Sequence, residues 1–183
     1  TLLGPQQEHW LESSLADARG VWTVLGQQSL FGKRDNLPGP GELLWNDSWD
    51  GYAPARRRVT DAFQKHGVAN PVILGGDVHE NWVGHVLADY DRPDSPVVGV
   101  EFCGTSITSR AGGADRVAQR LAENPHFVFA DGWRRGYGLC EFTPERLTTR
   151  LRVVEDVSRF ETGIETLAAF EVKPGQPRIE RLG

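Results

Sequence analysis

The first part of the chain alternates between helical spacing and short apolar runs. Trp10, Leu11, Leu15 and Ala18 recur at helical spacing, which predicts a first helix that opens at Gly4-Pro5 and ends at Arg19-Gly20. A second helix is expected over residues 54–66, with its apolar face formed by Ala55, Val59, Ala62 and Phe63. Residues 29–53 show neither helical spacing nor the short apolar run of a strand, so a long loop is expected there. Loops of this length inside a domain tend to be functional or mobile.

The remainder of the pattern consists mainly of short apolar runs bounded by turn residues. Strands are expected over residues 21–28, 70–75, 81–90, 97–103, 127–130, 136–143, 147–157 and 166–172, with a third helix over 112–123. Helices therefore come early and strands dominate later. This order predicts an α/β (α+β) fold, a layered mixed β-sheet flanked by helices, in a single domain covering residues 1–183.

Composition and charge exclude several classes of protein. Of the 183 residues, 39% are hydrophobic and 25% charged, which is typical of a globular chain. No apolar run approaches the ~20 residues that a membrane helix needs, so no membrane span is expected. The net charge of -5 argues against nonspecific nucleic-acid binding, which relies on a basic surface, but it leaves room for a local cationic pocket.

Cysteine and methionine usage bear on the origin of the chain. Cys103 and Cys140 permit one disulfide, although two buried thiols fit the sequence at least as well. The chain has no Met and begins at Thr1, which predicts a processed chain or a piece of a longer one. Its first 20 residues lack the basic start and apolar stretch of a signal sequence, so we expect any export signal to lie upstream.

The stretch GGDVHENW, which follows the apolar run of residues 72–74, carries the strongest indication of chemistry. Ligands gather at the carboxyl ends of strands in open α/β sheets, and Gly75 and Gly76 permit a tight turn there. In extended backbone, Asp77 and His79 would point to the same side and offer half of a metal site. The alternative is that Asp77 caps a turn and His79 is a buried histidine with its hydrogen bonds satisfied.

Several stretches, in order, resemble PhoD-like phosphatases, a family of the calcineurin-like metallophosphoesterases. The resemblance covers roughly residues 3–157. It rests on LGPQQEHWL (3–11), GQQ (26–28), DSWDGY with RRR (47–52 and 56–58), GGDVHENW (75–82), VEFCGTSITS (100–109), NPH (124–126) and RRGY (134–137). It implies that the chain is the C-terminal half of a four-layer sandwich. It also suggests an exported, periplasmic or secreted, protein.

The resemblance implies metal-dependent hydrolysis of phosphate mono- or diesters, in which a metal-activated hydroxide or oxide attacks phosphorus. Fe3+ and Ca2+ are the metals expected. Asp77 and His79 would be metal ligands, with Glu80 or Asn81 near enough to orient the imidazole. The candidates for substrate contact are Asp50, Tyr52, Asn81 and Arg135.

Other interpretations of these residues stay open. Trp49 and Tyr52 would pack the loop down while Asp50 caps the next helix, and residues 56–58, three adjacent arginines, are more typical of a solvated helix face. The same two interpretations, a phosphate contact or a solvated face, apply to Arg134 and Arg135. Residues 105–108 could meet a phosphate or form a polar turn.

The family's remaining metal ligands have no counterpart in this sequence, which contains no Asp-Asp-His segment. We therefore expect this chain to supply only part of an active site, to need the missing N-terminal half, and to be inactive or weak alone. Two alternatives are a non-catalytic metal-binding or interaction domain and a carbohydrate-binding module, the latter suggested by Trp45 and Trp49.

Overall fold

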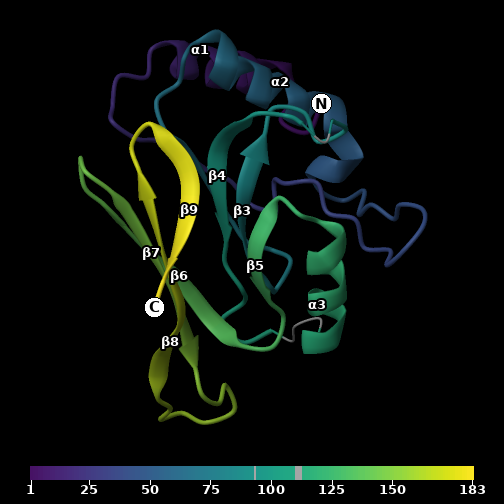
Figure 1. Cartoon of the computed structure of the whole chain (residues 1–183), viewed down its shortest axis with the longest axis vertical. Coiled ribbons are helices and arrows are strands. Elements are labelled where there is room, and N and C mark those ends of the chain that lie inside the picture. Colours follow the sequence, from purple (N-terminus) through teal and green to yellow (C-terminus); the bar gives the residue numbers. More distant parts are fainter. Residues whose placement is uncertain (93, 110–112) are drawn as a thin grey trace.

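The elements follow the chain in nearly the expected order (Figure 1). The computed structural model describes residues 1–92, 94–109 and 113–183. Its elements are α1 (Pro5–Ala16), β1 (Thr23–Gly26), the 3-10 helix η1 (Trp49–Tyr52), α2 (Ala53–Lys65), β2 (Pro71–Gly75), β3 (Asn81–Leu87), β4 (Val97–Cys103), α3 (Ala114–Glu123), β5 (Phe127–Asp131), β6 (Arg135–Phe142), β7 (Leu147–Val154), β8 (Ile164–Lys173) and β9 (Gln176–Leu182).

The strands form two sheets. The first is mixed, with the order β1-β2-β4-β3-β5; β1, β2 and β4 are parallel, and β3 runs antiparallel to both β4 and β5. The second is an antiparallel meander, β6-β7-β8-β9. The expected mixed sheet with flanking helices is therefore confirmed, and a second sheet is added to it.

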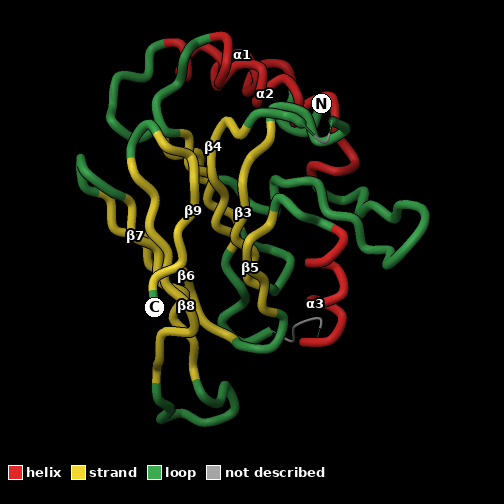
Figure 2. The backbone as a smooth tube through the Cα atoms, viewed as in Figure 1, coloured by secondary structure: helices red, strands yellow, loops and turns green. Residues whose placement is uncertain are grey.

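The two faces of the mixed sheet carry different cores. Strand residues alternate between faces, so Val72 meets the second sheet at Leu151 and Phe170 while its neighbour Ile73 packs under the helices. The α1–α2 pair and α3 cover the helical face, which gives layers of helices, mixed sheet and antiparallel sheet. Figure 2 shows the helices at the upper and right-hand margins of the strands.

The first helical pair is fastened by both apolar and charged contacts. Leu11 and Leu15 are buried against α2, and Arg58 pairs with Glu8 at 2.8 Å. Trp10, expected on the apolar face, is instead 63% exposed. The helix ends at Ala16, before the expected stop at Arg19-Gly20.

The sequence prediction missed one strand and misplaced some ends. β9 was not expected, since its sequence QPRIERL buries only Ile179. β3 stops at Leu87 instead of residue 90, and β7 at Val154 instead of 157. The expected start of the third helix, Gly112, lies outside the described residues.

Two further expectations concern the cysteines and membranes. Cys103 and Cys140 are both free thiols, so they do not form a disulfide. Burial raises the pKa of both thiols. In the described parts of the chain, no helix combines the length and apolar character needed to cross a bilayer.

Candidate functional site

The carboxyl ends of three parallel strands meet at one edge of the mixed sheet. The chain leaving β1 is joined to the chain leaving β2 by a hydrogen bond from Gly76 N to the carbonyl of Gln28, at 3.0 Å. Gly104, just after β4, donates to the carbonyl of Gly75 at 2.9 Å. These bonds bring residues far apart in sequence together at the edge where ligands bind in such sheets.

Asp77 and His79 lie at this edge, but their backbone is not extended as expected. Asp77 has φ 69° and His79 has φ 58°, both in the left-handed region that non-glycine residues seldom adopt. Val78 N bonds the carbonyl of Gly76 at 2.8 Å, which closes a three-residue turn. Both side chains are exposed. Strained backbone of this kind clusters at functional sites.

The first glycine of the pair preceding Asp77 is required by close packing. A Cβ at Gly75 would overlap the carbonyl oxygen of Ser29 and the side-chain amide of Gln27. Only glycine therefore lets the end of β2 approach the chain that leaves β1.

Thr105 connects the segments around the turn. Its backbone N–H donates to Asn81 Oδ1 at 3.2 Å. Its hydroxyl lies 3.1 Å from the carbonyl oxygens of both His79 and Arg134. Through these bonds, Thr105 fixes the backbone of His79 relative to β3 and to the start of β6.

Asn81 and Arg135, two candidates for substrate contact, flank this junction. Asn81 is buried, and its Nδ2 has no hydrogen-bond partner within the described residues. Arg135 donates through Nη1 to the carbonyl of Trp133, while its buried Nε lacks a partner in the same part of the chain. Unsatisfied buried donors of this kind are available to a ligand or to water.

Asp50 and Tyr52, the other two candidates, lie on a different element. Asp50 is buried in η1, where its carboxylate accepts from the backbone N–H of Arg34 at 3.1 Å and from the guanidinium of Arg56. It does not cap α2, because the cap residue there is Tyr52 and no side-chain bond is made. The side chain of Asp50 therefore faces the interior of the protein.

The expectation of a solvated arginine face is wrong for Arg56. It is buried, pairs with Asp50, and lies 4.9 Å over the ring of Tyr90. Arg57 and Arg58 are exposed as expected. Trp49, a residue of the carbohydrate alternative, is 2% exposed and packs on Phe31, so it offers no ring to a sugar.

Glu80 is the buried carboxylate that pairs with two arginines beside the turn. Its carboxylate, 3% exposed, accepts from Arg34 at 3.0 Å, from Arg120 at 3.1 Å and from the indole N–H of Trp82 at 2.9 Å. Burial lowers the pKa of Arg34, and the charge of Glu80 opposes that shift. These contacts hold Glu80 against α3 and the long loop. The sequence analysis expected Glu80 or Asn81 to orient the imidazole of His79, and this expectation stays a prediction.

A cleft of about 1080 Å³ begins at Asp77 and Val78. Its remaining lining residues are Arg34, Asn36, Pro38, Leu43, Leu44, Trp45, Asn46, Asp47, Glu80, Arg116, Gln119 and Arg120. One wall is the long loop and the other is α3. The sequence did not identify Arg116, Gln119 or Arg120 as site residues. Their spacing of three and four places them on one helix face.

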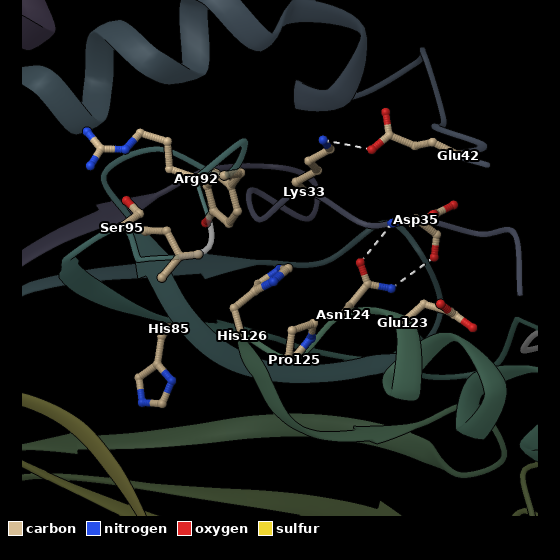
Figure 3. Close-up of a pocket in the computed structure, with 12 residues that line it drawn as sticks. Lys33, Asp35, Glu42, His85, Arg92, Ser95, Glu123, Asn124, Pro125 and His126 are labelled. Atoms are coloured by element: carbon tan, nitrogen blue, oxygen red, sulfur yellow. Dashed lines mark hydrogen bonds and ion pairs between the residues drawn. The ribbon is translucent and has the colours of Figure 1, made fainter. Parts of the chain in front are cut away.

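A second pocket, of about 420 Å³, lies toward the opposite end of β3 (Figure 3). Lys33 points to Glu42, with which it pairs at 2.7 Å, and Asn124 faces the backbone of Asp35. Burial lowers the pKa of His126 to about 4, so its imidazole is neutral at pH 7. The pocket does not include Asp77 or His79.

Glu101 anchors the start of the long loop. It lies in β4, fully buried, and accepts from the backbone N–H groups of Phe31 at 2.6 Å and Gly32 at 2.8 Å. Burial raises the pKa of its carboxyl from 4.5 to about 7, an effect that these hydrogen bonds oppose.

The donor atoms near the turn would satisfy part of a metal site. A carboxylate and an imidazole suit iron, and carboxylate oxygen suits calcium. Across residues 1–92, 94–109 and 113–183, however, no three His, Cys, Asp or Glu side chains group closely enough to hold a metal. Asp77 and His79 would thus need further ligands.

Three comparisons with known proteins agree on one family. The family model described as PhoD-like phosphatase matches residues 1–151. Alkaline phosphatase D of Bacillus subtilis (strain 168) is 37% identical over 185 residues, an alignment that covers 100% of this chain and 32% of the relative. The solved structure described as "Structure of PhoD" matches with a TM-score of 0.90 and 36% identity, covering 98% of this chain and 35% of that one. The chain therefore spans about a third of their length.

Proposed function

Because this chain belongs to the PhoD-like phosphatase family, we propose that it contributes part of the active site of a metal-dependent phosphoesterase that hydrolyses phosphate mono- or diesters. The observation that carries this proposal is the exposed pair Asp77 and His79 at the carboxyl edge of the parallel strands. A pair sealed in a dry interior would have no room for an ion.

Asp77 and His79 would hold metal ions, with Fe3+ and Ca2+ the ions expected. When bound, such ions supply positive charge that stabilises the phosphoryl oxygens and lowers the pKa of water. His79 would bind through a neutral imidazole, and the Thr105 contact to its backbone would limit its movement.

The other candidates would act on the substrate or on its neighbours. The free donors of Asn81 and Arg135 would bind phosphoryl oxygens, since a guanidinium suits phosphate geometry. Asp50 would act indirectly, by fixing the backbone of Arg34. Tyr52 is partly exposed beside it, and its role in substrate contact stays a prediction.

The remaining metal ligands would come from a segment outside these 183 residues. Within the described residues, β1 is hydrogen-bonded to a neighbouring strand on one side only. A parallel strand added at its other edge would deliver its own carboxyl end next to the chain that leaves β1, at the same edge of the sheet as Asp77, because parallel strands end at the same edge.

A phosphatase assay with added iron and calcium tests the proposal. The 183-residue chain should show weak metal binding and less than about 1% of the turnover of a full-length relative, since each ligand and positioning group lost typically costs at least tenfold. Turnover equal to that of the full-length enzyme would contradict the idea of a shared site.

A further inference from the structure

The cleft next to Asp77 is much larger than a phosphate group requires. At about 1080 Å³ it reaches the size of pockets that bury most of a drug-sized ligand. If metal ions held the phosphoryl group at the Asp77 end, most of this volume would face the organic part of the ester. The inference below therefore rests on the proposed function.

The loop wall offers a large apolar surface to that volume. Trp45 is 60% exposed, and Leu43 beside it is also exposed. Both line the cleft. An indole left open in a cleft wall provides a flat π-face, on which planar rings stack favourably.

The opposite wall offers a cation without a carboxylate partner. Arg34 and Arg120 are both paired with Glu80. Arg116, one helical turn before Arg120, is exposed and makes no hydrogen bond or ion pair within the described chain. A guanidinium plane stacks on aromatic rings as well as binding anions.

Arg116 could therefore stack on a ring or bind an anion, and the charge of Asp47 favours the ring. Asp47, exposed next to Trp45, would repel an anionic group at that end. We propose that Trp45 and Arg116 bind a neutral planar ring, such as an aryl group, in the organic part of the substrate. They are specificity-determining residues, and they do not take part in the bond cleavage.

Binding of two phosphonates to the metal-loaded, full-length protein tests this inference by calorimetry. The probes are 1-naphthylmethylphosphonate, which carries a planar ring, and methylphosphonate, which does not. Trp45→Ala should weaken binding of the naphthyl probe about tenfold, the usual effect of losing one stacking side chain, and Arg116→Gln about threefold. Both variants should bind methylphosphonate within about twofold of the parent.

Matched controls come from the same chain. Trp10→Ala removes an equally exposed tryptophan on α1, and Arg178→Gln removes an exposed arginine on β9. Neither residue lines the cleft, so both variants should bind both probes like the parent. Equal affinity of the parent for the two probes, or an unchanged naphthyl affinity in Trp45→Ala, would overturn the inference.

Hydrolysis of methyl phosphate and 1-naphthyl phosphate by the same proteins separates the two ideas. If the parent hydrolyses both esters and Trp45→Ala leaves its preference between them unchanged, the proposed function stands. The proposed binding of a planar ring by Trp45 and Arg116 is then refuted. A metal-loaded parent that neither hydrolyses these esters nor binds the phosphonates would refute both.

Discussion

At the scale of single residues, the buried charges beside the candidate site are balanced by direct contacts. Glu80 is shared by Arg34 and Arg120, and Asp50 pairs with Arg56. A buried charge left without its partner is strongly destabilising. These pairs therefore place the long loop and α3 firmly around the cleft.

Replacing Glu80 by Gln should reveal this balance. The variant leaves two guanidinium groups near each other without their carboxylate, so we expect a loss of about 3 kcal/mol in the free energy of unfolding. Denaturant unfolding of the protein measures it. Glu145→Gln, at an exposed carboxylate, should change stability by less than about 0.5 kcal/mol. Equal stability of Glu80→Gln and the parent would show that Glu80 does not balance the buried charges of Arg34 and Arg120.

Thr105 is expected to act as a positioning residue. Thr105→Val removes the hydroxyl that contacts the backbone of His79 and Arg134, which should cost about 1 kcal/mol of stability and lower kcat about tenfold. Thr105→Ser keeps the hydroxyl and should recover most of the activity. If Val and Ser variants have the same kcat, the hydroxyl does not position His79.

Residue-level prediction succeeded where chemistry is local and failed where packing decides. The double glycine marked the turn after β2 correctly, whereas the Asp-x-His spacing was wrongly interpreted as extended backbone. The left-handed backbone of Asp77 and His79 could not be read from the sequence, because non-glycine residues seldom adopt it. Arg56 was misjudged since its partner Asp50 becomes apparent only in three dimensions.

At the scale of elements, the contact between β4 and the long loop should respond to pH. The folded carboxyl of Glu101 has a pKa near 7 and the unfolded one near 4.5. Between these values the folded protein holds a proton that the unfolded chain has lost. Stability from this group is therefore complete below about pH 4.5 and declines as pH rises to about 7, by about 3 kcal/mol.

Glu101→Gln tests this pH dependence. Glutamine cannot ionise, so the variant should lose less stability than the parent between pH 5 and 7.5. Denaturant midpoints measured across that range give the comparison. Parallel pH profiles for parent and variant would show that Glu101 does not titrate as described.

Elements were predictable where their apolar periodicity is strong. β2, β4 and α2 have several buried positions each, and they were placed within a few residues. β9 buries only Ile179 and contains a proline, which is tolerated because it lies at the edge of its sheet. Its partner β8, rather than its own sequence, specifies it as a strand.

At the scale of the whole molecule, the chain combines a two-sheet core with a candidate site at the edge of one sheet. Residues of both sheets share one apolar cluster, so the fold does not depend on the mixed sheet alone. Sequence motifs pointed to the family, and its two-sheet architecture matches the solved relative. The cleft walls could not be foreseen, because α3 and the long loop meet only after folding.

The metal content of the full-length protein, measured by mass spectrometry after loading with iron and calcium, tests the central claim most directly. Asp77→Asn and His79→Ala should each lower bound metal at least tenfold and abolish most phosphoesterase activity if, as proposed, both side chains bind the metal directly. The control variants Asp115→Asn and His9→Ala alter exposed residues of the helices and should retain both. Parent-like metal content in Asp77→Asn and His79→Ala would contradict the assignment of this site.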